Sequence, residues 1–160
     1  MHLLPTVFVP LFLVVVGAAT ESWAEENPLF LFGGPNRDRF LGCLNCIPSE
    51  TFSIWNADGA YGSPSAADCV WNHNGAYGSP ASEYSPWNRT SANPPFVVDR
   101  AGNFYGYFTR NIKFPDSVMY KRSQRQAHGE VELRIYEFLA WFIEDYDLII
   151  ANLDEVRSNR

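Results

Sequence analysis

Residues 53–88 read SIWNADGAYGSPSAAD-CVWNHNGAYGSPASEY-SPWN, with a hyphen after every sixteenth residue. A Trp-Asn pair recurs at the same place in each block, as Trp55-Asn56, Trp71-Asn72 and Trp87-Asn88. A fixed period of this kind indicates stacked units. The rest of the chain is therefore interpreted around a repeat array that covers residues 46–93.

Each unit of the array is rich in turn residues. Asp58-Gly59 and Asn74-Gly75 favour tight turns, because glycine adopts positive φ at no steric cost. No apolar run within a unit is long enough for a helix, so each unit is predicted to be an irregular coil with two bends. Such a coil cannot bury its own rings. We therefore expect the three indoles to stack on one another, and Tyr61 to lie over Tyr77.

The same residues carry a binding hypothesis. Aromatic rings beside asparagine can stack on sugars, whereas the competing interpretation is that rings in an ordered array form the core and the asparagines bind turn backbone. The candidate binding residues are Trp55, Asn56, Tyr61, Trp71, Asn72, Tyr77, Trp87 and Asn88. A calcium site built from Asp58, Asp68 and Asn74 lacks the dense aspartate pattern of known calcium loops.

A Cys-x-x-Cys pair, Cys43 and Cys46, precedes the array. Redox use normally places the first cysteine at a helix N-terminus. Gly42 and Pro48 argue against a helix here, so in an exported protein a local disulfide is predicted. No cofactor is expected on this interpretation.

An alternative for the cysteines is zinc. Cys43, Cys46, Cys69 and His73 form a C-x2-C…C-x3-H set, and three thiolates with one imidazole satisfy tetrahedral zinc. Against this, Cys69 occupies the position that Ser53 and Ser85 hold in the other units, which indicates a serine replacement.

The first residues indicate export. Residues 3–16 are almost wholly apolar, and small side chains before Glu25 mark a cleavage site after Ala24. We therefore predict a signal peptide at residues 1–24 and a single exported domain at residues 25–160, in the periplasm, on the cell surface or secreted. An uncleaved anchor is the alternative, although the run is short of the roughly twenty apolar residues of a full span.

Charge and motifs narrow the function classes. The formal net charge of −6 disfavours nucleic acid and anionic lipid, which leaves a protein or a glycan as the expected partner. No phosphate loop, dinucleotide fingerprint or nucleophile elbow is present. A Cys69–His73 dyad lacks a third, orienting group. The chain is therefore predicted not to be an enzyme.

Beyond the array, residues 96–109 are predicted to form a β-hairpin, with Gly102 in the left-handed position of its loop. Strand alternation places Phe104, Gly106 and Phe108 on one face, with Tyr105 and Tyr107 on the other. Residues 111–129 are polar and are predicted to be a loop or a frayed turn.

Residues 130–156 are predicted to form one amphipathic helix, because apolar residues recur every three or four positions. Its apolar surface is wide, which indicates burial on two sides, with a homodimer through this helix as the alternative. The predicted fold class is small α+β: irregular repeat coils, one β-hairpin and a C-terminal amphipathic helix.

The array resembles that of a family of uncharacterised exported bacterial proteins with S-x-W-N-x-x-G-x-Y-G-S-P repeats. The matching text here runs from Ser53 to Pro64, and the resemblance extends over residues 40–110. It implies export and a bacterial source, and no reaction. The departures are Cys69 for the usual serine and residues 89–91 in place of the third glycine turn.

The functional expectation is a non-catalytic exported binding or structural module of the cell envelope. The alternative is a zinc-binding or thiol-redox protein that uses Cys43, Cys46, Cys69 and His73.

Overall fold

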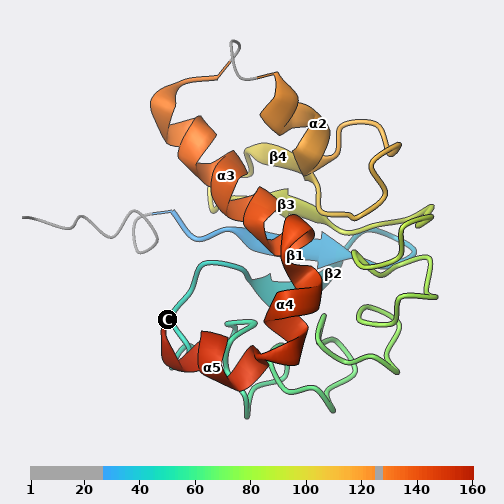
Figure 1. Cartoon of the computed structure of the whole chain (residues 1–160), viewed down its shortest axis with the longest axis vertical. Coiled ribbons are helices and arrows are strands. Elements are labelled where there is room, and N and C mark those ends of the chain that lie inside the picture. Colours follow the sequence, from blue (N-terminus) through green and yellow to red (C-terminus); the bar gives the residue numbers. More distant parts are fainter. Residues whose placement is uncertain (1–26, 125–127) are drawn as a thin grey trace, which may run out of the picture.

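The computed structural model describes residues 27–124 and 128–160, and within them it is a small α+β protein built on one antiparallel sheet. The sheet has the strand order β2-β1-β3-β4 (Figure 1). The strands are β1 (Phe30–Gly33), β2 (Arg39–Cys43), β3 (Phe96–Val98) and β4 (Phe104–Tyr107). The helices are α2 (Val118–Ser123), α3 (Glu130–Glu144), α4 (Tyr146–Ala151) and α5 (Leu153–Ser158). The α+β class expected from the sequence is confirmed.

The predicted signal peptide at residues 1–24 lies outside the described residues. Within the part of the chain that is described, no helix combines the length and the apolar character needed to cross a bilayer.

The hairpin expected at residues 96–109 forms the β3–β4 half of the sheet. Gly102 lies in its loop with φ +85°, as expected for the left-handed position. The prediction was incomplete on the other half. It did not foresee β1, which joins β2 to β3 and so connects the hairpin to the rest of the sheet.

The predicted face assignment of β4 was wrong. Tyr105 and Phe108 are buried in the core, whereas the rings of Phe104 and Tyr107 contact each other at 5.5 Å on the opposite side. Gly106, which lies between Phe104 and Tyr107 in the sequence, has φ +119° and breaks the alternation of side chains along the strand. A side chain at Gly106 would approach a backbone carbonyl oxygen to 2.7 Å, so only glycine fits this irregularity.

The chain between β2 and β3 consists of turns and bends, apart from one isolated bridge that attaches it to the sheet edge. At that bridge Cys43 N–H donates to the Phe52 carbonyl at 2.7 Å, and Ile54 N–H donates to the Cys43 carbonyl at 3.1 Å. Residues 44–95, called the array segment from here on, therefore continue from β2.

The three indoles of the array segment form a column. The ring centroids of Trp55 and Trp71 are 5.4 Å apart, and those of Trp71 and Trp87 are 5.5 Å apart. Each indole N–H donates to a backbone carbonyl of the preceding stretch, at 2.9, 2.7 and 2.5 Å; the acceptors are Leu44, Ile54 and Val70. Every buried indole nitrogen of the column is therefore paired, as a buried polar group requires.

The single helix predicted at residues 130–156 is three helices in the structure, and this prediction was wrong. The chain leaves helical geometry at Asp145 (φ −97°, ψ 13°) and at Asn152 (φ −127°, ψ 33°). Aspartate and asparagine interrupt helices because their side chains compete for backbone hydrogen bonds. The first break lets Tyr146 stack on Trp87 at 4.2 Å.

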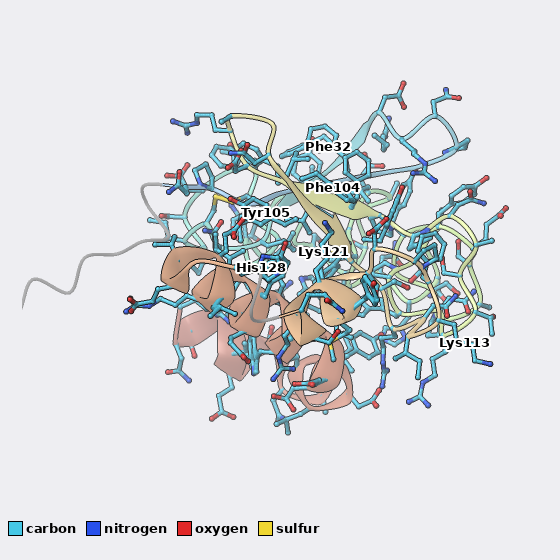
Figure 2. All side chains as sticks on the ribbon, turned by 90° about the horizontal axis from the view of Figure 1, so that it is seen from above. Phe32, Phe104, Tyr105, Lys113, Lys121 and His128 are labelled. Atoms are coloured by element: carbon cyan, nitrogen blue, oxygen red, sulfur yellow. A yellow bond between two sulfur atoms is a disulfide. The ribbon has the colours of Figure 1, made fainter. Side chains whose placement is uncertain are left out.

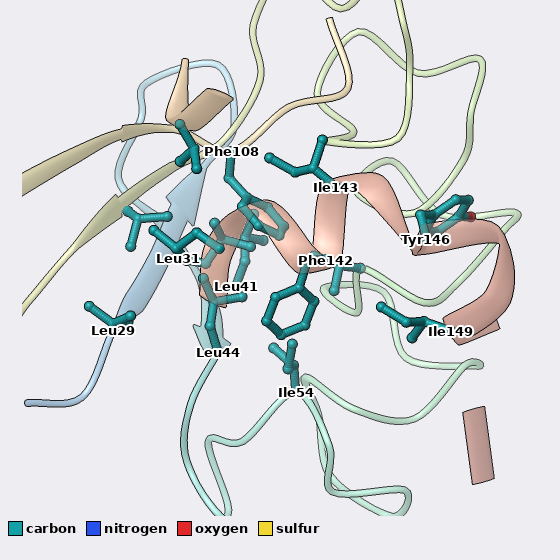
Figure 3. Packing of buried hydrophobic residues seen from close by; sticks show 14 of the residues in the cluster. Leu29, Leu31, Leu41, Leu44, Ile54, Phe108, Phe142, Ile143, Tyr146 and Ile149 are labelled. Carbon is teal, nitrogen blue, oxygen red and sulfur yellow. The ribbon is translucent and has the colours of Figure 1, made fainter. Parts of the chain in front are cut away.

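The core joins the sheet, the array segment and α3. In Figure 1, α3 crosses one face of the sheet, and α4 and α5 lie beside the array segment. Figure 3 shows Phe142 of α3 directed into the cluster of buried side chains, and its ring stacks on Trp55 at 5.3 Å. The apolar side of α3 is thus used within the chain, and nothing in the described residues supports the alternative of a homodimer through this helix.

Residues 111–129 were predicted to lack regular structure, yet they contain α2. Ser117 caps this helix, since its hydroxyl accepts the N–H of Tyr120 at 3.2 Å. The serine-capped start is a sequence signal that was overlooked.

Candidate binding surface

The three tryptophans proposed as ligand contacts form part of the interior. Trp55 and Trp71 are 1% exposed, and Trp87 is 2% exposed. A ligand on the surface of this structure cannot stack on the faces of these rings. Their burial agrees with the competing interpretation, in which the array rings form the core.

The three asparagines hold the turns of the array segment. Their side-chain amides donate to backbone carbonyls six residues earlier, and their side-chain oxygens accept backbone N–H groups two residues later. For Asn72 the distances are 3.0 Å to the Ala66 carbonyl and 3.1 Å from the Asn74 N–H. Asn56 and Asn88 make the equivalent bonds. These amides are committed to the backbone and are not free for a ligand.

Tyr61 and Tyr77, like the three asparagines, are partly exposed. The ring of Tyr61 meets Phe40 of β2 edge to face at 4.9 Å. Tyr77 lies beside the β1–β2 loop, where its hydroxyl approaches Gly34. Burial raises the pKa of Tyr77 above its ordinary value.

The cysteines are divided between two environments. Cys43 and Cys46 form a disulfide. Cys69 is a free, buried thiol that accepts the N–H of Trp71 at 3.3 Å, in the same way that Ser53 and Ser85 accept from Trp55 and Trp87. Burial raises the pKa of Cys69 to about 11.

The structure does not bring the proposed zinc ligands together as free donors. Two of the thiols are bonded to each other, and His73 Nε2 instead lies 3.2 Å from the hydroxyl of Tyr146. No group of three or more His, Cys, Asp or Glu side chains suited to a metal ion occurs in residues 27–124 and 128–160.

A different set of rings gathers on the side of the sheet that faces away from the helices. This set, called the aromatic face from here on, consists of Phe30, Phe32, Phe40, Phe52, Tyr61, Phe96, Phe104 and Tyr107. Each ring contacts at least one other at a centroid distance between 4.9 and 6.4 Å. All eight are at least partly exposed, and Phe104 is 42% exposed.

Strand geometry places these rings together. On β1 and β3, Leu31 and Val97 point into the core with no exposed surface, so their neighbours Phe32 and Phe96 point outward. Figure 2 shows Phe32 and Phe104 on the outer side of the sheet and Tyr105 and His128 on the side of the helices. At β1 and β3 the sheet therefore presents aliphatic residues to the core and rings to the outside.

Cations border the aromatic face at β4. The guanidinium of Arg37 lies 5.0 Å from the centroid of the Tyr107 ring and donates to its hydroxyl. The ammonium of Lys121 lies 5.3 Å from the centroid of Phe104. At the other side Arg39 pairs with Asp68 at 2.6 Å. The border thus offers both donors and acceptors around a mostly apolar centre.

Periodicity alone could not reveal the aromatic face. In residues 30–32 the outward Phe, inward Leu and outward Phe are all apolar, so the two-residue period is hidden in a continuous apolar run. The available signal was composition, because the chain holds 12 Phe and is 16% aromatic. The chain therefore holds more aromatic residues than the array alone contains.

Comparisons with protein-family models, with curated proteins and with solved structures find no match for this chain.

Proposed function

We propose that this protein is a non-catalytic exported binding module, and that the aromatic face is its ligand surface. The observation that supports the proposal is the continuity of eight partly exposed rings over one side of the sheet. Monomeric proteins rarely expose large contiguous apolar patches unless the patch contacts a partner. The proposal of export to a bacterial envelope rests on the sequence: the N-terminus is apolar, and the array resembles that of exported bacterial proteins.

The ligand class that fits this surface is a glycan chain. The faces of sugar rings carry C–H groups, and these pack against the electron-rich faces of aromatic side chains. The hydroxyls at the edges of a sugar need donors and acceptors, which Arg37, Lys121 and the Arg39–Asp68 pair supply at the border. A row of rings across four strands suits a linear ligand that contacts several sugars in succession.

The proposal is tested by calorimetric titration of the protein with xylohexaose, cellohexaose and chitohexaose. We expect saturable binding of at least one of the three, and Phe104→Ser should weaken that binding by about tenfold, or about 1.4 kcal/mol. Phe104 is the most exposed ring of the face, so its replacement leaves the core intact.

Leu148→Ser is the matched control, because Leu148 is 64% exposed on α4, away from the sheet. Both variants should keep the thermal midpoint of the parent protein to within a few degrees. Absence of binding to all three hexasaccharides, or equal binding by the Phe104 variant and the parent, would refute the proposal.

A further inference from the structure

A groove separates the array segment from α4 and α5, away from the aromatic face. It consists of two hollows of about 440 and 390 Å³. His73 and Ile150 line both hollows, so the two lie next to each other. Each volume falls within the range of about 300–1,000 Å³ that is typical of small-ligand sites.

The middle of the groove combines apolar side chains with one polar contact, and its parts are fixed in place. Trp71 and Trp87 of the indole column line its floor, one in each hollow, and Ile150 lies between them on α4. His73 Nε2 lies 3.2 Å from the Tyr146 hydroxyl, and this contact joins the array segment to α4. The ring of Tyr146 is held in turn by stacking on Trp87.

One end of the groove carries an excess of positive charge. Arg89, Arg110 and Asp147 line this end. Arg110 is occupied, since it binds Asp147 through two hydrogen bonds of 3.0 Å. These bonds, with the charges of Arg110 and Arg89, hold the pKa of Asp147 below its usual range. Arg89 is exposed and is the arginine available to an incoming anion.

The other end carries an excess of negative charge. Asp154, Glu155 and Arg157 line it. Arg157 is only 8% exposed, donates to the Gly62 carbonyl and lies 3.3 Å from Asp154, so it serves to attach α5 to the array segment. Its Nε has no hydrogen-bond partner within the described residues. Glu155 is exposed and is the carboxylate available to a cationic group of a ligand.

We propose that this groove binds a short peptide with free ends. The peptide carboxylate pairs with Arg89, the ammonium pairs with Glu155 and Asp154, and an apolar side chain lies over Ile150. Segregated charge at the two ends selects a zwitterionic ligand, because a neutral sugar would gain nothing from it and a single ion would meet repulsion at one end. The site is separate from the aromatic face, and its occupation does not depend on glycan binding.

The test uses the tetrapeptide Ala-Leu-Leu-Ala with both ends free, with the amino end acetylated, with the carboxyl end amidated, and with both ends blocked. Binding is measured by NMR titration at low ionic strength, where interactions of exposed charges are least screened. We expect saturable binding of the free peptide, and each blocked end should weaken it by about fivefold.

Two variants test which end of the peptide lies at which end of the groove. Arg89→Gln should weaken binding of the free and acetylated peptides but should not weaken the amidated peptide further. Glu155→Gln should show the reverse pattern. Arg134→Gln on α3 is the control, since Arg134 is exposed and, within the described residues, pairs with Glu130 of its own helix. Equal affinity for the free and doubly blocked peptides, or no saturable binding of the free peptide, would overturn the proposal.

Discussion

The indole nitrogen of Trp71 donates a hydrogen bond of 2.7 Å to the carbonyl oxygen of Ile54, the residue just before Trp55. Trp87 repeats this relationship with Val70, the residue just before Trp71. Each tryptophan therefore fixes both the ring stack and the backbone of the preceding unit. The column explains how a segment built of turns becomes the centre of a rigid core.

Replacement of the central indole should be costly. Trp71→Phe keeps an aromatic ring but leaves the buried Ile54 carbonyl without its donor and opens a small cavity. We expect a loss of about 2–4 kcal/mol in the free energy of unfolding, measured by guanidinium denaturation. Trp141→Phe is the control, because Trp141 is partly exposed and should cost less than about 1.5 kcal/mol. Equal losses for the two variants would contradict the role assigned to the column.

Gly78 should not tolerate a side chain. A Cβ atom there would stand 2.2 Å from the carbonyl oxygen of Asn72, which is backbone and cannot rotate away. Gly78→Ala is therefore expected to destabilise the protein by about 3 kcal/mol or more. Gly129→Ala, where a Cβ meets nothing within 4 Å, should change stability by less than about 1 kcal/mol. Thermal midpoints of the two variants give the comparison, and similar midpoints would show that the turn is not so tightly packed.

The three cysteines should differ in reactivity. Without reductant, iodoacetamide at pH 8 should leave the native protein unlabelled, because Cys69 is buried and its pKa is raised to about 11. In denaturant one thiol should react, and after reduction three should react, as counted by intact mass. Labelling of three thiols without reduction would contradict the Cys43–Cys46 disulfide and favour the thiol or zinc alternative.

Asp99 should make the stability of the folded protein depend on pH in the acidic range. Burial by itself would raise the pKa of this carboxyl, but hydrogen bonds from Asn103, Tyr105 and Ala101 favour the charged form and lower it. A carboxylate with a lowered folded pKa stabilises the protein above its unfolded pKa of about 3.9, and the stabilisation is lost as the pH falls through the folded value.

Asp99→Asn should therefore be less stable than the parent at pH 7, and the difference should shrink toward pH 2. Urea denaturation at both values measures it. Asp58→Asn, at an exposed position, is the control and should show little difference at either pH. A difference for Asp99→Asn that stays constant with pH would remove the carboxylate charge as its cause.

The sequence predicted those features that depend on local spacing. The sixteen-residue period predicted that the indoles would meet, and the loop around Gly102 predicted the β3–β4 pairing. The breaks in the last helix fall at Asp145 and Asn152, and the spacing of the apolar residues continues through both of them. The first break is accompanied by a tertiary contact, the stacking of Tyr146 on Trp87, which spacing does not encode.

The candidate residues chosen from the sequence differ from the aromatic face for a related reason. A tryptophan in a repeat has the same pattern whether it faces solvent or core, and only the arrangement of neighbouring units shows that Trp71 is buried. The aromatic face joins Phe32, Phe40 and Phe96 from three strands, so it exists only once the sheet order is known.

The most direct test of the central claim is an NMR titration of protein that carries ¹³C-labelled phenylalanine rings, with whichever of the three hexasaccharides binds most tightly. The ring signals of Phe32, Phe96 and Phe104 should shift on binding, while those of the buried Phe108 and Phe142 should remain unchanged. Unshifted signals from the first three rings, in a protein that binds the sugar, would show that the aromatic face is not the ligand surface.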